Sequence, residues 1–232
     1  MVYAIVLRYT IYMSMKPLGK VSTRWSDDLA YVIGLIVSDG NLSKDGRHIL
    51  FTSKDYDLAA SYKEALNLGV IIGKKGNGSN PQKRYHVVQF GDKLFYNFLL
   101  SLGITPKKSK TLGSVKIPRK YFYHYLRGCY DGDGHFYSYW DKRWKSSYMY
   151  YLGITSASLS HILWLREKLN FLLDTKGHIT RHGKGSAYQL KFGKKESLII
   201  LRKIYPTSSV RCLSRKRLKI ERALAIINEK LS

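Results

Sequence analysis

The sequence predicts an α+β fold built from two tandem repeats related by a pseudo-twofold axis. Each repeat has the element order αββαββα and one antiparallel four-stranded sheet. Two observations predict this architecture. The segment VIGLIVSDG at residues 32–40 returns as LRGCYDGDG at residues 126–134, and VVQFG at residues 87–91 returns as QLKFG at residues 189–193. Self-similarity at a regular spacing indicates two copies of one structural unit.

The elements of the first repeat follow from capping signals and hydrophobic periodicity. The run Ser-Asp-Asp at residues 26–28 is typical of a capped helix start, and an apolar run leads from it to Asp39. Alternation over residues 41–53 predicts a hairpin that turns at Asp45-Gly46. The remaining predicted elements are helices at 55–68 and 92–102 and strands at 70–75 and 85–90.

The second repeat keeps this order but has a longer first hairpin. Matching residues lie 94 positions apart at Asp39 and Asp133 and 103 positions apart at Leu66 and Leu169, so the extra residues fall within the aromatic stretch 135–154. The basic C-terminal tail has an apolar periodicity that predicts one more helix. The predicted boundaries are an arm at 1–23, a first half-domain at 24–104, a linker at 105–117 and a second half-domain at 118–232.

The charge balance indicates a polyanionic partner. Lys and Arg number 40 against 16 Asp and Glu, and this formal net charge of +24 exceeds what solubility requires, so nucleic acid is the first candidate. The aromatic content excludes a disordered basic tail. Cys129 and Cys212 are too few for a disulfide framework or a zinc site and are interpreted as reduced thiols. The apolar N-terminal stretch lacks the features of a signal peptide, so we expect an intracellular protein with no membrane partner.

Each repeated segment places an aspartate where a helix is expected to end. The helix macrodipole is negative at that end, so Asp39 and Asp133 are unfavourable there, and more so if the two ends meet. Gly34 and Gly128 would let two helices pack closely. A divalent cation, which prefers hard oxygen ligands, would resolve the electrostatic conflict.

Other interpretations of the two Asp-Gly pairs explain less. Either copy alone is typical of a turn. An EF-hand loop that opened at Asp131 would need Gly and Glu where the sequence has Phe136 and Lys142, so that site is excluded. A phosphatase-type aspartate motif would need a preceding strand, whereas the residues before Asp131 lack strand alternation. The interpretation therefore depends on the duplication.

Both segments resemble the signature of the LAGLIDADG homing endonucleases, in which two such helices pack at a pseudo-twofold axis and each brings an acidic residue to a metal ion. The resemblance covers nearly the whole chain after the arm. It implies that Asp39 and Asp133 bind Mg²⁺ or another divalent cation, with the carbonyls of Ser38 and Gly132 as further ligands, for phosphodiester hydrolysis. Nearby basic residues are also implied, and the candidates are Lys54, Lys108 and Lys216.

The two half-sites differ chemically. Val37 takes the first acidic position of the signature, where the second copy has Asp131, and Ala157 lies where the first half has Lys54. In the family to which the resemblance points, this asymmetry suits a monomer that needs no protein partner. Its partner would be a double-stranded DNA target that is not palindromic.

The last strand of each repeat predicts which sheet face meets DNA. Gln89 and Lys191 alternate with apolar residues that suit the helix side of each sheet. The resemblance implies that the two sheets together form a DNA-binding saddle and that its open face, opposite the helices, lies in the major groove. There Gln typically reads adenine and Lys guanine. For any single basic residue, a solvated charge or a phosphate contact is the alternative. The predicted DNA-binding residues are Arg47, His48, Thr52, Lys75, Lys83, Arg84, Tyr85 and Gln89 in the first half and Tyr137, Tyr139, Lys142, Arg143, Lys145, Thr180, His182, Lys184, Gln189 and Lys191 in the second.

The resemblance implies a site-specific endonuclease that makes a metal-dependent double-strand break with cohesive ends. Two alternatives stay open. An intron-encoded RNA maturase, or a DNA-binding protein of the same fold, would use the same basic face without cleavage and would not need both carboxylates. A transcription regulator would normally carry one motif together with a helix-turn-helix. The presence of both Asp39 and Asp133 favours the nuclease.

Overall fold

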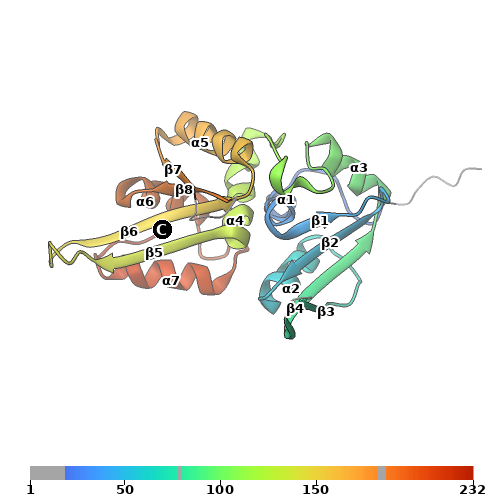
Figure 1. Cartoon of the computed structure of the whole chain (residues 1–232), viewed down its shortest axis with the longest axis horizontal. Helices are drawn as coiled ribbons and strands as arrows, with labels where there is room; N and C mark the ends of the chain where they lie inside the picture. The colour runs from blue at the N-terminus through green and yellow to red at the C-terminus, as the bar shows by residue number, and fades with distance from the viewer. Residues whose placement is uncertain (1–18, 78–79, 182–186, 232) are drawn as a thin grey trace, which may run out of the picture.

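The computed structural model describes residues 19–77, 80–181 and 187–231 and shows two similar halves side by side (Figure 1). Most of the predicted arm therefore lies outside the described residues. The first half contains α1 (Asp27–Asp39), β1 (Gly40–Leu42), β2 (His48–Ser53), α2 (Tyr56–Ala65), β3 (Gly73–Asn77), β4 (Asn80–Gly91) and α3 (Lys93–Ser101).

The second half repeats the order of the first and adds one helix. It contains α4 (Phe122–Asp133), β5 (Gly134–Trp140), β6 (Tyr148–Ser156), α5 (Leu159–Leu173), β7 (His178–Arg181), β8 (Tyr188–Phe192), α6 (Lys194–Ile204) and finally α7 (Ser214–Ala225). Two short 3₁₀ helices, η1 (Lys108–Lys110) and η2 (Arg119–Tyr121), connect the halves.

Each half has one antiparallel sheet of four strands. The strand order is β1-β2-β4-β3 in the first half and β5-β6-β8-β7 in the second, so the predicted α+β repeat is confirmed. The register agrees as well, because Gln89 lies opposite Leu50 and Lys191 lies opposite Gly153. Gln89 and Lys191 therefore occupy equivalent positions in their sheets.

One face of each sheet is buried against helices. Val88, Phe90, Leu190 and Phe192 are at most 3% exposed, and α2 and α3 pack on the first sheet as α5 and α6 pack on the second. Gln89 and Lys191 alternate with these residues and are exposed on the opposite face. The predicted division into a helix face and an open face is therefore correct for both last strands.

Helices α1 and α4 lie against each other at the centre of the molecule, between the two sheets (Figure 1). Their backbones touch at the repeated glycines. A Cβ atom on Gly34 would lie 2.1 Å from the carbonyl oxygen of Tyr125, and one on Gly128 would lie 2.0 Å from the carbonyl oxygen of Tyr31. Neither position has room for a side chain, which explains why glycine occurs in both copies.

The β3–β4 hairpin extends further than side-chain alternation predicts. β4 begins at Asn80 and β3 at Gly73, whereas we expected strands at 85–90 and 70–75. Backbone pairing continues through a polar, glycine-containing sequence in which alternation gives no signal. The predicted extension in the second half is confirmed, because β5 has seven residues and β1 has three. Within the described ranges, no helix is long and apolar enough to cross a membrane.

Candidate functional site

The C-terminal ends of α1 and α4 bring Asp39 and Asp133 together. Because the two helices touch along their glycines, their last turns end at the same place. The contact is close: a Cβ atom on Gly132 would lie 2.1 Å from the hydroxyl oxygen of Ser38 and 2.9 Å from a carboxylate oxygen of Asp39. Each signature helix thus presents one carboxylate at a shared centre.

The two carboxylates are costly to ionise. Burial, and after it the charge of Asp133, raises the pKa of Asp39 to about 6. Burial also raises the pKa of Asp133, while Lys216 and Lys108 oppose that shift. The side chain of Asp133 is the more exposed of the two. A pair of partly desolvated carboxylates at two helix C-termini favours a cation between them.

Two lysines occupy matching places beside the carboxylates. The Lys108 ammonium, which is buried, donates to the carbonyl oxygen of Gly40. The Lys216 ammonium donates to the carbonyl oxygens of Tyr130, Gly132 and Gly134 at 2.7, 3.0 and 2.6 Å. Burial lowers the pKa of each lysine to about 8, and the carboxylates oppose the shift. Each ammonium thus binds carbonyl groups where a signature helix ends.

The third predicted lysine, Lys54, lies further out. It is exposed and contacts the ring of Tyr85, with its ammonium 5.9 Å from the ring centroid. Lys54 and Tyr85 line a cavity of about 380 Å³ into which Asp39 opens, together with Thr52. The structure therefore places Lys54 at the mouth of this cavity and not among the carbonyls that Lys108 and Lys216 bind.

The donor set fits a divalent metal ion of the magnesium type. In the described part of the chain, His, Cys, Asp and Glu form no cluster of three or more that would enclose a metal. Mg²⁺ commonly binds through one or two carboxylates and completes its shell with water and substrate phosphate. Asp39 and Asp133 supply that number of carboxylates. The Gly132 carbonyl accepts from Lys216, and the Ser38 hydroxyl donates to the carbonyl of Gly34 at 3.0 Å.

Asp131, the additional acidic residue of the second signature, faces the interior. It is 1% exposed and accepts hydrogen bonds from Tyr31, Tyr205 and the backbone of Leu213. Sequence reasoning assigned it no role beyond making the half-sites unequal. A signal was present, because the matching position in the first repeat is apolar Val37. A charged residue at a position where the other copy has an apolar, half-buried side chain indicates internal polar partners.

The open sheet faces carry many of the predicted DNA-binding residues, and the two halves differ in the types of side chain that they expose. The first half presents Gln89, Thr52 and exposed basic residues. The second half presents a stack of aromatic rings, in which Tyr139 lies 5.4 Å from Tyr137 and 6.3 Å from Tyr151 between ring centroids. Among the other predicted residues, those exposed are Arg47, Lys75, Arg84, Lys142, Arg143, Lys145 and Lys191, and those partly buried are His48, Tyr85, Thr180 and Gln189. His182, Lys184 and the side chain of Lys83 lie outside what the structure describes.

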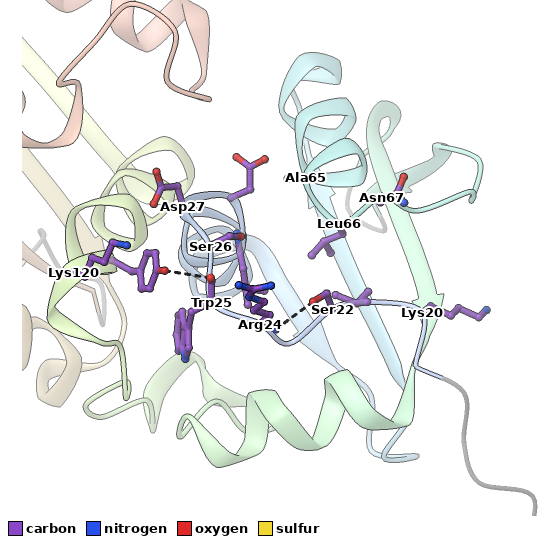
Figure 2. Close-up of a pocket in the computed structure, with 14 residues that line it drawn as sticks. Lys20, Ser22, Arg24, Trp25, Ser26, Asp27, Ala65, Leu66, Asn67 and Lys120 are labelled. Carbon is purple, nitrogen blue, oxygen red and sulfur yellow. Dashed lines mark hydrogen bonds between the residues drawn. The ribbon is translucent and has the colours of Figure 1, made fainter.

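A separate cavity of about 880 Å³ opens at the N-terminal end of α1 (Figure 2). Trp25 forms part of its wall and stacks on Tyr121, whose hydroxyl donates to the Trp25 carbonyl at 3.2 Å. Basic Lys120 lies on the same side of the cavity as acidic Asp27, and Lys20 lies on the opposite side (Figure 2). The carboxylate pair lies at the other end of α1, so this cavity is not part of the site.

No protein-family model and no curated protein sequence matches the chain. Solved structures do match it. Full-length DUF199/WhiA from Thermatoga maritima is similar with a TM-score of 0.57 at 16% identity, over 88% of this chain and 61% of that one. The chain thus spans about 61% of the length of that relative. The homing endonuclease I-WcaI bound to its DNA recognition sequence gives a TM-score of 0.58 at 14% identity, over 89% of this chain and 88% of that one.

A third similar structure, I-DmoI in complex with DNA and Mn, gives a TM-score of 0.50 at 18% identity, over 78% of this chain and 97% of that one. At such identities the likeness shows the fold alone. That fold is the one shared by LAGLIDADG homing endonucleases and by the LAGLIDADG domain of WhiA, as the repeated signature predicted. One of these relatives is not named as an endonuclease, so activity has to be argued from the site.

Proposed function

We propose that this chain, which has the LAGLIDADG homing endonuclease fold, is a site-specific DNA endonuclease. It makes a metal-dependent double-strand break in a long, non-palindromic target and leaves cohesive ends. The observation that carries this proposal is the pair of carboxylates, Asp39 and Asp133, at the touching ends of α1 and α4. A protein that only binds DNA gains nothing from two acidic groups held near a phosphate backbone.

In this proposal Asp39 and Asp133 would hold Mg²⁺. When bound, the metal would supply activation of water and stabilisation of the leaving 3′ oxygen. Lys108 and Lys216 are protonated at neutral pH, because their lowered pKa values of about 8 still lie above it. Their ammonium groups are held by carbonyls beside the carboxylates and neutralise charge that develops on phosphate.

The same proposal assigns DNA to the open faces of the two sheets. The net charge of +24 suits a polyanion, and Gln89 and Lys191 are exposed at equivalent register positions. The I-WcaI and I-DmoI structures of the same fold are named as DNA complexes, the latter with Mn, which supports a duplex partner and a divalent ion. Since both signature helices are in one chain, a monomer suffices.

The direct test is a cleavage selection from a randomised duplex library with Mg²⁺, followed by assays on the selected target. The parent should cut both strands, and sedimentation with the duplex should give one protein per DNA. Asp39→Asn and Asp133→Asn should each abolish cleavage and leave binding nearly unchanged, because each removes a metal ligand but no base contact.

Asp174→Asn is the matched control. Asp174 ends α5 with a φ of 52°, which asparagine tolerates, so this variant should cut at the parental rate. If the parent binds a selected duplex but never cuts it, the chain is a DNA-binding protein of this fold. If either site variant cuts at the parental rate, the metal assignment is wrong.

A further inference from the structure

The carboxylate of Asp131 is buried where α1, α4 and the segment before α7 meet. Its Oδ2 atom accepts hydrogen bonds from the Tyr31 hydroxyl and from the backbone N–H of Leu213, both at 2.8 Å. Its Oδ1 atom accepts from the Tyr205 hydroxyl at 3.2 Å. With 1% exposure and three donors, the carboxylate is satisfied by protein groups.

One of these donors sets the start of a helix. Leu213 is the residue that caps α7, and its carbonyl oxygen accepts the backbone N–H of Lys216 at 3.0 Å in the first turn. The side chain of Lys216 then reaches the carbonyls of Tyr130, Gly132 and Gly134. The hydrogen bond from the N–H of Leu213 to Asp131 therefore fixes the position of the first turn of α7, which carries Lys216.

A second residue of α4 holds the segment before α7 at other points. The Arg127 guanidinium donates to the carbonyls of Ile204 and Arg211 at 2.9 and 2.8 Å. These hydrogen bonds hold the chain segment between the end of α6 and Arg211 against α4. The contact of Asp131 is the one that bonds the capping residue of α7 itself.

The first half positions its lysine in another way. Ile33 and Val37 stand where the second half has Arg127 and Asp131. Lys108 is delivered by η1, and the chain just after it is held by α5, where Ser158 donates to the carbonyl of Leu112 and a ring nitrogen of His161 lies 2.9 Å from the carbonyl oxygen of Gly113.

We propose that Asp131 is a positioning residue for Lys216: by accepting the N–H of Leu213 it fixes the first turn of α7 and holds the Lys216 ammonium on the carbonyls beside Asp133. The consequence for cleavage rests on the proposed function. The placement of Lys216 does not, so the two can fail separately.

The decisive comparison is between an amide and an apolar side chain at position 131. Asp131→Asn keeps one oxygen for Leu213 and Tyr31, and its amide can donate to the Tyr205 hydroxyl, so the position of α7 should persist. Asp131→Val installs the residue type of the first half and removes every acceptor. A metal ligand or a required charge would make both variants equally damaging.

The first readout needs no DNA. Brief labelling with acetic anhydride, resolved by peptide mass spectrometry, should modify Lys54 quickly and Lys216 and Lys108 slowly in the parent. Asp131→Val should raise the labelling of Lys216 towards that of Lys54 and leave Lys108 protected, while Asp131→Asn should match the parent. If Lys216 stays protected in Asp131→Val, the proposal is wrong.

The matched control is another buried aspartate. Asp92 caps α3 and accepts from the backbones of Lys20, Val21 and Phe95, so Asp92→Val removes comparable hydrogen bonds in the first half. It should lower thermal stability without raising the labelling of Lys216. Exposure of Lys216 in this control would mean that general loosening, and not Asp131, explains the effect.

The second readout is cleavage of the selected duplex. Asp131→Val should slow cleavage by the same factor as Lys216→Met, and the double variant should be no slower than either single variant. Additive losses would contradict a role through Lys216. A parent that does not cut overturns the proposed function and leaves the labelling result standing.

Should Asp131→Val fail to fold, Leu213→Pro removes the same hydrogen bond from the other side. The φ of Leu213 is −80°, which proline adopts, and Leu213→Ala serves as the control because it loses the side chain but keeps the N–H. Lys216 should become reactive in the proline variant only. Equal reactivity in both would overturn the proposal.

Discussion

The two halves share one topology but extend different hairpins. In the first half, β1 has three residues and the β3–β4 hairpin is long, with twelve residues in β4. In the second half, β5 has seven residues and β8 has five. The central helices show no such divergence, because a backbone contact at Gly34 and Gly128 tolerates no side chain. Packing constrains the middle of this fold, whereas the ends of the sheets are free to change.

The halves also differ in the burial and hydrogen bonding of their matching charged residues. Lys108 is buried and has one carbonyl partner, while Lys216 is less buried and has three. Asp39 is more buried than Asp133. These pairs allow direct tests of whether the half-sites are equivalent in function.

The largest expected effect comes from the lysine pair. Lys108→Met and Lys216→Met should each slow cleavage by about a hundredfold, because each removes a preorganised positive charge near the reacting phosphate. Since the lysines occupy matching places in two half-sites, the two variants should slow nicking of opposite strands. A nicking assay with separately labelled strands measures this. If either variant slows both strands equally, the two lysines serve one shared centre.

A smaller effect is expected on stability without metal. The folded-state pKa of Asp39, about 6, lies above its ordinary value of 3.8, so the ionisation of Asp39 lowers the free energy of unfolding increasingly from pH 3.8 to 6 and by its full amount above pH 6. Asp39→Asn should therefore raise the free energy of unfolding at pH 7.5 by up to about 3 kcal/mol. The gain should shrink as pH falls through 6 and vanish below the unfolded pKa. Urea unfolding with a chelator between pH 3.5 and 8 would show this, and a gain that persists at the acid end would contradict it.

The same experiment compares the two carboxylates. Asp133→Asn should change stability in the same direction, but by less, because Asp133 is more exposed than Asp39, whereas Lys216 and Lys108 oppose the pKa shift of both carboxylates. Equal gains for both variants would show that exposure does not separate the two half-sites.

The smallest effects concern base recognition. Gln89→Ala and Lys191→Ala should each relax preference at one base pair of their own half-site, by about 1–3 kcal/mol. Binding profiles over all single-base variants of the target measure this. Lys145→Ala, at the exposed end of the β5–β6 hairpin, should instead weaken binding to every sequence alike and lower the salt slope by about one unit. Uniform losses for all three variants would mean that these strands contact phosphate.

The sequence predicts the fold well because its strongest constraints are local and repeated. The contact between α1 and α4 requires a glycine on each helix, Gly34 and Gly128. Each of these helices also ends in an aspartate, so both features appear twice in the sequence. Alternation around Gln89 and Lys191 reports a sheet with one buried face. These features can be interpreted without knowledge of distant contacts.

What the sequence does not predict depends on contacts between remote segments. The partners of Asp131 come from positions as far apart as Tyr31 and Leu213, and no local pattern relates them. The early start of β4 depends on pairing with β3 and not on side-chain alternation. The contact of the candidate Lys54 with Tyr85 likewise joins it to another strand, β4, and no local pattern relates the two residues.

The close contact of α1 with α4 has a geometric consequence for the proposed reaction. Because both carboxylates stand at the ends of helices whose backbones touch, the separation of the two cut positions would be set by the protein and not by the DNA. The contact between α1 and α4 would determine that separation. Changes in the sheets would alter which sequence is bound, whereas the length of the single-stranded overhang would stay constant for every target.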